Sequence, residues 1–219
     1  MRPSYAAPMK FGPIPAHPDV VLEQQETVWS GRFDVDVVKF RHRRFDGTMS
    51  GLRTWEVFRR GPAAALLPYD PWTDQVVLME QFRLPALAAG MEPVMMEIPA
   101  GLCDTGEAPE ATVRREIQEE IGLQADRVVP FGDVVLTPGG SDERCSLFAG
   151  RVRAPAAGPD GIAGTAGLAS EQEDIRVRVL PAALAIERAV DGQYSNSVTM
   201  LALLWLAARR ERLRAEWLA

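Results

Sequence analysis

Polar and apolar residues alternate along the first part of the chain, from about residue 20 to residue 57. Residues 32–40, RFDVDVVKF, show the pattern clearly, and a period of two is typical of strands that cover a core with one face. The Asp46-Gly47 pair marks a turn between such strands. The pattern therefore predicts a small antiparallel β-subdomain, assigned to residues 19–60, whose simplest role is to cover one side of a main domain.

Residues 1–18 precede this subdomain and form a proline-rich arm. They include five prolines, at positions 3, 8, 13, 15 and 18. Because proline fixes φ and lacks an amide hydrogen, we expect this segment to be extended or loosely ordered.

Continuous apolar runs replace the alternation in the remainder of the chain. Residues 63–67 and 75–79 predict two buried strands, joined by a turn at residues 69–71. Residues 128–136 and 145–153 predict two further strands.

Three helices are expected in the same region. The clearest covers residues 109–121, because Pro109 is tolerated in the first turn of a helix and Gly122 suits its C-terminal cap. A second covers residues 181–190. A last helix runs from about Ser197 to the end of the sequence, with its apolar half on the sheet and its arginine-rich end in solvent.

Residues 154–174 are rich in glycine and alanine and end in the acidic stretch SEQED. A loop of this length is uncommon in a compact domain unless it is functional or disordered. Its acidic end could serve only to keep the loop solvated, or the loop could close over a bound substrate.

Composition fits a soluble, cytoplasmic protein with one main domain, assigned to residues 61–219. The chain has 219 residues, 47% of them hydrophobic, and a net charge of −6, which argues against a general nucleic-acid partner. Its two cysteines provide no disulfide framework and no signal pattern opens the sequence, so a reducing cytoplasm is the default. The longest apolar run, residues 198–208, is too short to span a bilayer.

Residues 101–123, GLCDTGEAPEATVRREIQEEIGL, carry the densest charge pattern. In a helix over residues 109–121, Glu116, Glu119 and Glu120 fall within an arc of roughly 100°. Three carboxylates this close raise one another's pKa unless a cation neutralises them. Oxygen ligands one helical turn apart suit Mg²⁺ or Mn²⁺, which usually keeps several waters and takes further ligands from substrate phosphate.

An apolar stripe of Val113, Ile117 and Ile121 adjoins these acids, which therefore border the buried face of the helix. Arg115 could hold one carboxylate in place through a bidentate contact. The alternative is that these charges form an ordinary solvent-exposed helix face without a functional role, which is the usual explanation of an isolated charge run. The glycines at both ends of the stretch and the upstream glutamate favour a functional site instead.

Every fixed position of the Nudix box is filled in this stretch, so the chain resembles the Nudix hydrolases, which cleave a nucleoside diphosphate linked to another group. The box has the form G-x5-E-x7-R-E-U-x-E-E-x-G-U, with U an aliphatic residue. Its fixed positions here are Gly101, Glu107, Arg115, Glu116, Ile117, Glu119, Glu120, Gly122 and Leu123. The resemblance implies an α/β fold, the Nudix α/β/α sandwich with a mixed sheet, carrying a small N-terminal antiparallel β-subdomain.

Two segments narrow the resemblance to the bacterial type of the ADP-ribose pyrophosphatase branch. They read EQFR at residues 80–83 and EIPA at residues 97–100, immediately before the box. Arg83 alone could be a surface arginine, but its place at the end of a strand that runs toward the box favours a phosphate contact. Pro138, fifteen residues after the box, has the placement that in this family tends to accompany ADP-ribose hydrolysis, although a Pro-Gly turn alone could explain it.

The resemblance also implies roles for individual residues. The stretch GLASEQEDIRV resembles the loop that folds over the metals, which makes Glu171 the general base and Glu173 a further metal contact. The implied metal ligands are Ala100, Glu116, Glu120 and Glu173; the implied catalytic residues are Glu171, Glu119 and Arg115; and the implied substrate contacts are Arg83, Phe33, Trp55, Gly139, Gly140 and Glu143.

In this branch the N-terminal subdomain usually exchanges across a two-fold axis. The resemblance therefore implies a homodimer in which each active site borrows residues from its partner. Trp55 departs from the pattern, because close relatives often have there an arginine that sandwiches the adenine with an aromatic residue. The flat indole of Trp55 could still stack a base together with Phe33.

Three functions are compatible with these features. The leading one is Mg²⁺-dependent hydrolysis of ADP-ribose to AMP and ribose 5-phosphate, with Mn²⁺ as an alternative metal. The second is hydrolysis of another nucleotide sugar, such as GDP-mannose, or of a broad range of nucleoside diphosphate derivatives. The third is a Nudix-like sensor that binds ADP-ribose without turnover; such relatives often lose box glutamates, all of which are present here.

Overall fold

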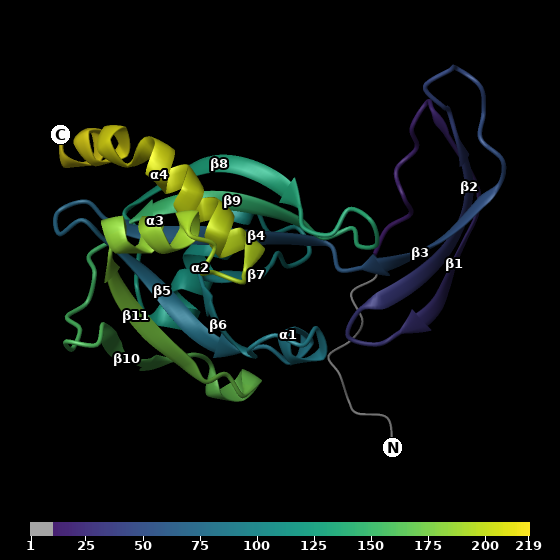
Figure 1. The fold of residues 1–219 in the computed structure, drawn as a ribbon. Coiled ribbons are helices and arrows are strands. Elements are labelled where there is room, and N and C mark those ends of the chain that lie inside the picture. Colours follow the sequence, from purple (N-terminus) through teal and green to yellow (C-terminus); the bar gives the residue numbers. More distant parts are fainter. Residues whose placement is uncertain (1–10) are drawn as a thin grey trace. The chain divides into compact units, whose positions relative to one another are not determined.

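The computed structural model describes residues 11–219 apart from the side chain of Glu171. The chain forms two compact units, whose elements are labelled in Figure 1. The first unit combines the N-terminal region up to Pro62 with the segment Val135–Arg144, and the second contains Ala63–Val134 and Cys145–Ala219. The arm expected at residues 1–18 lies partly outside the described residues, and residues 11–16 carry no regular secondary structure.

A three-stranded antiparallel sheet forms the centre of the first unit. Its strands, in the order β1-β2-β3, are β1 Val20–Ser30, β2 Asp34–His42 and β3 Arg53–Arg59. The turn at Gly47 has a φ of +85°, which glycine adopts without strain, and the Gly47 amide donates to the Arg44 carbonyl at 3.0 Å. The antiparallel subdomain expected from the alternating pattern is confirmed.

The segment Val135–Arg144 belongs to the first unit because it pairs with β3. The Phe58 amide donates to the Gly140 carbonyl at 2.8 Å. The carboxylate of Asp142 accepts a hydrogen bond from Nε of Arg59 at 2.7 Å, and Arg59 is only 6% exposed. Since a buried guanidinium needs charged or polar partners, this segment completes the interior of the first unit. The unit is therefore discontinuous in sequence, which the assignment of residues 19–60 did not anticipate.

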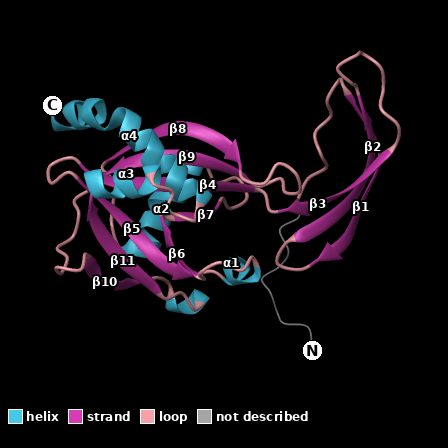
Figure 2. Cartoon of the chain, in the orientation of Figure 1, coloured by secondary structure: helices cyan, strands magenta, loops and turns pink. Residues whose placement is uncertain are grey.

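An eight-stranded mixed sheet forms the second unit (Figure 2). The order along its main path is β10-β11-β5-β4-β9-β8, while β6 pairs with β5 and β7 pairs with β4. The strands are β4 Pro62–Asp70, β5 Gln75–Phe82, β6 Val94–Glu97, β7 Ala100–Leu102, β8 Arg127–Val135, β9 Arg144–Arg151, β10 Ile162–Ala166 and β11 Ile175–Pro181. The helices are α1 Leu84–Ala88, α2 Pro109–Ile121, the short 3-10 helix η1 Ala169–Glu171, α3 Ala182–Val190 and α4 Ser197–Leu218.

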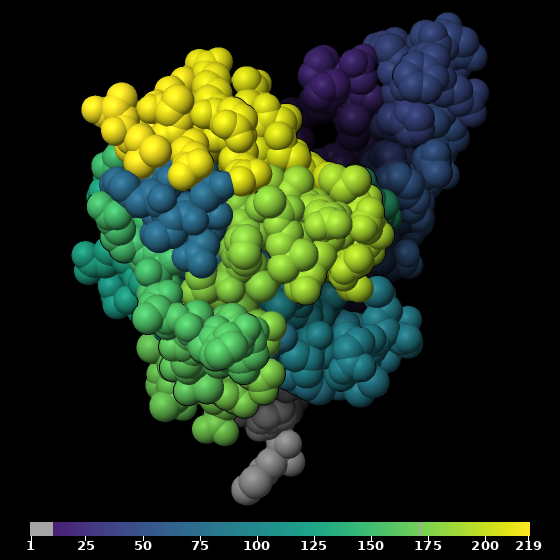
Figure 3. Space-filling model, turned by 60° about the vertical axis from the view of Figure 1, so that its left-hand side comes forward, coloured from purple at the N-terminus to yellow at the C-terminus, as the bar shows by residue number. Residues whose placement is uncertain are grey.

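Helices cover both faces of this sheet, as the α/β/α sandwich requires. On one face, Ile117 of α2 lies in the same buried cluster as Val77 and Met79 of β5. On the other face α3 and α4 lie side by side, and Figure 3 shows them in lime and yellow. None of the described helices has the length and hydropathy of a bilayer-spanning segment. The fold class predicted from the sequence is confirmed.

The turn expected at residues 69–71 lies slightly later in the chain. Tyr69 and Asp70 end β4, and residues 71–74 make the turn. The Asp70 carboxylate stabilises this turn by accepting hydrogen bonds from the backbone amides of Trp72 and Thr73, at 2.9 and 3.2 Å. The aspartate therefore belongs to the strand while its side chain caps the turn.

Residues 154–174 are not a single loop, because they contain β10 and η1. β10 pairs antiparallel with β11 at the edge of the sheet. β10 contains Gly164, at a φ of +139°, lies between Gly161 and Gly167, and shows no alternation of apolar and polar residues. The glycines that made this stretch resemble a loop thus occur within and beside a short strand.

Candidate active site

Helix α2 spans Pro109–Ile121, the range predicted from the sequence. Pro109 lies in the first turn, where an amide hydrogen has no partner within the helix. Gly122 ends the helix in the left-handed conformation, with a φ of +68°, and its amide donates to the Gln118 carbonyl at 3.1 Å. The apolar stripe is buried, so the helix is anchored and its acids are held at the edge of the core.

Arg115 binds three carboxylates of the box. Its Nε and Nη2 donate to the two oxygens of Glu107 at 3.2 and 3.0 Å. Its Nη1 donates to Glu116 at 2.7 Å and to Glu119 at 3.0 Å. The hydrogen bonds from Arg115 lower the pKa of Glu107 to about 2, and Glu107 in turn raises the pKa of Arg115. Arg115 is therefore a permanent charge that orients the acids around it.

Glu120 is the most deeply buried acid of the box, with 4% of its surface exposed. Its Oε2 accepts a hydrogen bond from the Ala100 amide at 2.9 Å. Burial, together with smaller contributions from the charges of Glu116 and Glu173, raises the pKa of Glu120 to about 9, although the Ala100 hydrogen bond acts in the opposite direction. Burial also raises the pKa of Glu116, to which the charge of Glu173 contributes. The structure thus places Glu116 and Glu120 beside the backbone of Ala100 and Gly101, with Glu173 near enough for its charge to act on both acids.

Arg83 adjoins this acid cluster from the end of β5. Its Nη2 and Nε donate to the Glu97 carboxylate at 2.7 and 3.2 Å. Glu97 is 5% exposed and also accepts a hydrogen bond from the side-chain Nδ2 of Asn196 at 3.1 Å. Although burial lowers the pKa of Arg83, the Glu97 carboxylate raises it overall, with additional contributions from Glu120 and Glu173. Glu97 therefore fixes a guanidinium beside the acids.

Gly101 leaves the space that Glu116 occupies. A Cβ atom at this position would lie 1.8 Å from Oε1 of Glu116 and 2.2 Å from its Cδ. The Glu116 carboxylate therefore lies directly against the backbone of β7, next to Ala100. This contact explains why the first position of the box is glycine in this chain.

These donors fit a divalent cation of the Mg²⁺ type. Buried carboxylates that raise one another's pKa are stabilised by a cation, and oxygen is the ligand that Mg²⁺ prefers. As placed in the described part of the chain, no three acidic, histidine or cysteine side chains converge on a single point. Arg115 binds Glu116 and the Ala100 amide binds Glu120, so a cation and Arg115 would compete for the Glu116 carboxylate.

Residues 59–193, which contain the whole acid cluster, match the NUDIX domain family. The chain belongs to the Nudix family. An ADP-ribose pyrophosphatase of Escherichia coli strain K12 is 41% identical over 199 residues, which cover 91% of this chain and 93% of that protein. A GDP-mannose pyrophosphatase of Yersinia pestis strain Pestoides F is 36% identical over 150 residues, which cover 68% of this chain and 72% of that protein.

The fold of this Nudix chain is also similar to a solved structure. The crystal structure of an ADP compounds hydrolase superimposes with a TM-score of 0.63 and 20% sequence identity, covering 90% of this chain and 98% of that one. At this identity the match bears on the fold alone. The resemblance to the Nudix hydrolases drawn from the box is confirmed.

Two aromatic residues expected to bind substrate belong to the first unit of the Nudix chain. Phe33 packs edge-on against Phe58, with ring centroids 5.3 Å apart. Trp55 packs against Phe40 instead, at 5.4 Å. Within one chain, the two rings expected to stack a base therefore have different aromatic neighbours and do not pack on each other.

The other substrate contacts expected in the first unit lie in its second segment. Gly139 precedes Gly140, whose amide donates to the Thr137 carbonyl at 3.0 Å in a turn. Glu143 forms an ion pair with Arg60 at 3.1 Å, and burial raises the pKa of Glu143. The structure therefore gives Glu143 a partner within its own unit.

Glu171 ends the short helix η1, and its side chain lies outside the described residues. The neighbouring Glu173 is well defined by its contacts. Its amide donates to the Leu168 carbonyl at 3.2 Å, and its Oε2 accepts from the Leu168 amide at 3.1 Å. A Cβ atom at Gly167 would lie 2.8 Å from that of Glu173, so this glycine permits the tight turn in which the Glu173 carboxylate binds the Leu168 amide.

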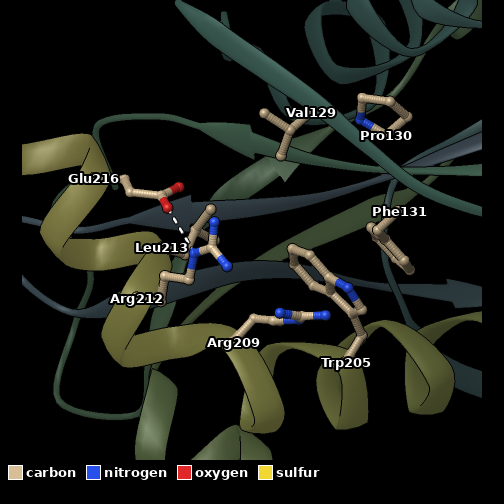
Figure 4. Close-up of a pocket in the computed structure, with 8 residues that line it drawn as sticks. All are labelled: Val129, Pro130, Phe131, Trp205, Arg209, Arg212, Leu213 and Glu216. Carbon is tan, nitrogen blue, oxygen red and sulfur yellow. Dashed lines mark hydrogen bonds and ion pairs between the residues drawn. The ribbon is translucent and has the colours of Figure 1, made fainter.

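A cavity of about 360 Å³ lies elsewhere in the second unit of the Nudix chain, between β8 and α4 (Figure 4). Phe131 and Trp205 stack at its wall, with ring centroids 4.4 Å apart, and Arg209 and Arg212 also line it. None of the box acids borders this cavity. We therefore assign the candidate active site from the chemistry of the box acids and not from the cavity between β8 and α4.

Two residues of the site were not assigned a role from the sequence. Glu97 holds Arg83, and Glu107 holds Arg115. Glu97 could have been identified from the sequence because it is a charged residue directly after the apolar run VMM, shortly before the box. The signal for Glu107 is its fixed box position eight residues before the arginine.

Replacing Gly101 by alanine is expected to preserve the fold and lower kcat by about 10²-fold, since displacements of about 1 Å in a site can have effects of this size. The new methyl group overlaps the end of the flexible Glu116 side chain, which moves before the backbone does. Steady-state kinetics and thermal unfolding would check this. Gly132→Ala is the control, because no atom lies within 4 Å of its added Cβ; equal activity of the two variants would contradict the expectation.

The stability of the metal-free protein is expected to fall as pH rises between about 4.5 and 9. Over this interval the folded state retains the Glu120 proton, whose pKa is about 9, whereas the unfolded chain releases it near the ordinary value of 4.5. The contribution of Glu120 to the free energy of unfolding is therefore complete below pH 4.5. It decreases above that pH and is lost as the pH rises through 9. Unfolding temperatures in EDTA at pH 5, 7 and 9 should therefore decline less steeply for Glu120→Gln; parallel curves would contradict this origin.

Proposed function

We propose that this chain hydrolyses the pyrophosphate bond of ADP-ribose, giving AMP and ribose 5-phosphate, with Mg²⁺ as the cofactor and Mn²⁺ able to replace it. The observation that carries the proposal is the buried Glu120 and the partly buried Glu116 against β7 at Ala100 and Gly101, with Arg83 beside them. The E. coli relative named ADP-ribose pyrophosphatase supports the choice of substrate, because the similarity covers nearly the full length of both chains.

The residues of the site have distinct roles in this reaction. A divalent cation bound by Glu116, Glu120, Glu173 and the Ala100 carbonyl would neutralise phosphate charge and lower the pKa of a water molecule. Arg83, which Glu97 holds through a hydrogen bond, would bind an oxygen of the pyrophosphate. Arg115 keeps the box acids oriented, as its hydrogen bonds to Glu107, Glu116 and Glu119 indicate.

Proton transfer completes the proposed step. Water attacks one phosphorus atom and its proton passes to Glu171, while the bond from that phosphorus to the bridging oxygen breaks. The leaving phosphate retains the bridging oxygen, so AMP and ribose 5-phosphate are the products. Glu119 is paired with Arg115 at 3.0 Å. Glu171 is therefore the better candidate for the base.

A panel of nucleoside diphosphate derivatives tests this function. Neither ADP-ribose nor GDP-mannose has a terminal phosphate monoester, whereas their hydrolysis products do, so added phosphatase releases inorganic phosphate only after turnover. The highest kcat/KM is expected for ADP-ribose. A preference for GDP-mannose would favour the function named for the Yersinia pestis relative. Binding of ADP-ribose without release of phosphate would favour a non-catalytic sensor.

A homodimer is part of the proposed function, as is a cytoplasmic location. The dimer rests on the resemblance to a branch whose N-terminal subdomains exchange, and the location rests on a sequence with only two cysteines. Light scattering should give a mass twice that of the 24.1 kDa chain. A fully active monomer would contradict the exchange.

Mixing two inactive variants tests whether the exchange builds the site. If Trp55→Ala is inactive, a mixture of it with Glu120→Gln should regain activity after subunits exchange, because one site of the mixed dimer then receives intact residues from both chains. No recovery would indicate that each site uses Trp55 of its own chain.

A further inference from the structure

Gln81 has a buried side-chain oxygen without a hydrogen-bond partner among the described residues, and the mechanism above does not use this side chain. It lies in β5 and is 9% exposed. Its Oε1 is inaccessible to solvent and accepts no hydrogen bond among the described residues. Because few buried polar atoms in folded proteins lack a partner, this oxygen requires an explanation.

The alternation of β5 places Gln81 on the sheet face that carries the active site. Side chains two residues apart in a strand point to the same face, so Gln81 shares a face with Val77 and Met79. Both of these pack in the same cluster as Ile117 of α2, the helix that bears the box acids. Gln81 is thus the next residue on this face after the apolar core ends.

The neighbouring strands place Gln81 between the groups of the acid cluster. On one side Gln81 lies opposite Met95 of β6, two residues before Glu97. On the other side it lies opposite Ile175 of β11, two residues after Glu173. Arg83, two residues after Gln81 and just beyond the end of β5, contacts Glu97. The amide therefore occupies the wall of the site beside the guanidinium proposed to bind phosphate.

The chemistry around Gln81 limits what can satisfy its amide oxygen. The nearby acids, when ionised, and a substrate phosphate offer oxygen acceptors and no donor hydrogen. A sugar hydroxyl supplies a hydrogen and can also accept one, so it complements the amide whichever of its two polar atoms faces the ligand. If a nucleotide sugar binds with its phosphate on Arg83, the sugar esterified to that phosphate would bring such hydroxyls close to Gln81.

We propose that Gln81 binds a hydroxyl of the sugar attached to the distal phosphate and so selects hydroxyl-bearing substrates. This inference rests on the proposed function, because it needs a nucleoside diphosphate sugar in the site. It adds a determinant of specificity to a segment in which only Arg83 had a role. A site built to hydrogen-bond a hydroxyl discriminates against ligands that lack it, because its polar group is then left unpaired.

The test compares ADP-ribose with the β-methyl ester of ADP, which keeps the adenosine and the pyrophosphate but has no distal hydroxyl. Hydrolysis of the ester gives AMP and methyl phosphate, which the same phosphatase assay detects. In Gln81→Met, the ratio of kcat/KM for ADP-ribose to that for the ester should fall about 10- to 100-fold, the range expected for one lost buried hydrogen bond. Methionine keeps the length of the side chain and removes its hydrogen bonds.

Controls separate this inference from folding and from the proposed function. Both substrates are measured on one preparation, so a misfolded fraction of the protein cancels in the ratio of kcat/KM values. Gln81→Asn, which shortens the side chain by one methylene group and so withdraws the amide, is a second variant if Gln81→Met does not fold. Gln193→Met, at an exposed position between α3 and α4, should leave the ratio unchanged. An unchanged ratio in both folded Gln81 variants would overturn the inference, whereas a wild type that hydrolyses neither substrate would overturn the proposed function.

Discussion

Glu120→Gln is expected to fold normally and to lose at least about 10³-fold in kcat, which corresponds to about 4 kcal/mol of transition-state stabilisation. The glutamine keeps an oxygen for the Ala100 amide, which now donates to Oε2 of Glu120 at 2.9 Å. It removes the negative charge that a divalent cation requires. Activity with ADP-ribose at saturating Mg²⁺ would measure the loss, and thermal unfolding would verify the fold.

Glu110→Gln is the matched control for this variant. Glu110 lies on the same helix but pairs with Arg114 at 2.9 Å on its exposed side. Exposed pairs of this kind contribute little to stability, so the control should behave as wild type. A Glu120→Gln enzyme with the wild-type rate at saturating Mg²⁺ would remove Glu120 from the proposed metal ligands.

Glu171→Gln is expected to lower kcat by about 10²- to 10⁴-fold while leaving KM nearly unchanged, the range that general bases usually contribute. A proton must leave the attacking water, and the box acids are engaged with Arg115 and with the Ala100 amide. Glu171 lies two residues before Glu173, which the acid cluster already includes. Steady-state kinetics over a range of ADP-ribose concentrations would separate kcat from KM.

Glu173→Gln distinguishes a base from a metal contact in the same segment. As a proposed ligand, its loss should be partly rescued by higher Mg²⁺, whereas Glu171→Gln should not respond. If Glu171→Gln retains a near-normal kcat and Glu119→Gln or Glu143→Gln shows the large loss, the base lies elsewhere and residues 167–174 act only as a lid.

The features that sequence reasoning located correctly have local causes. Helix α2 was predicted to the residue because its stripe has the helical period and because Pro109 and Gly122 mark its two ends. The N-terminal sheet was recognisable because polar and apolar residues alternate along the sequence of its strands. Its antiparallel strands follow one another in the chain, with residues 31–33 between β1 and β2 and residues 43–52 between β2 and β3, so the signal needs no distant partner.

The features that it missed depend on partners distant in the chain or on short segments. α1 has five residues, one of them proline, and β10 has five residues, one of them glycine, so neither carries a clear period. Asp142 joins the first unit through Arg59, which is 83 residues away in sequence. The deep burial of Glu120 depends on the Ala100 amide, and no pattern within the helix reports that contact.

The same separation between Arg59 and Asp142 has a consequence for how the protein is made. Ribosomes add roughly 5–20 residues per second, and a further stretch of chain must emerge before a tertiary partner becomes available. The β1-β2-β3 sheet is synthesised first, yet its buried guanidinium gains its second carboxylate only after 83 more residues have been added. For a period on the order of 4–16 s the nascent sheet has an incomplete interior. The part of the chain that is translated first is therefore completed only after α2 has been made, and during this interval its exposed strands are the segment most available to a chaperone or to a neighbouring nascent chain.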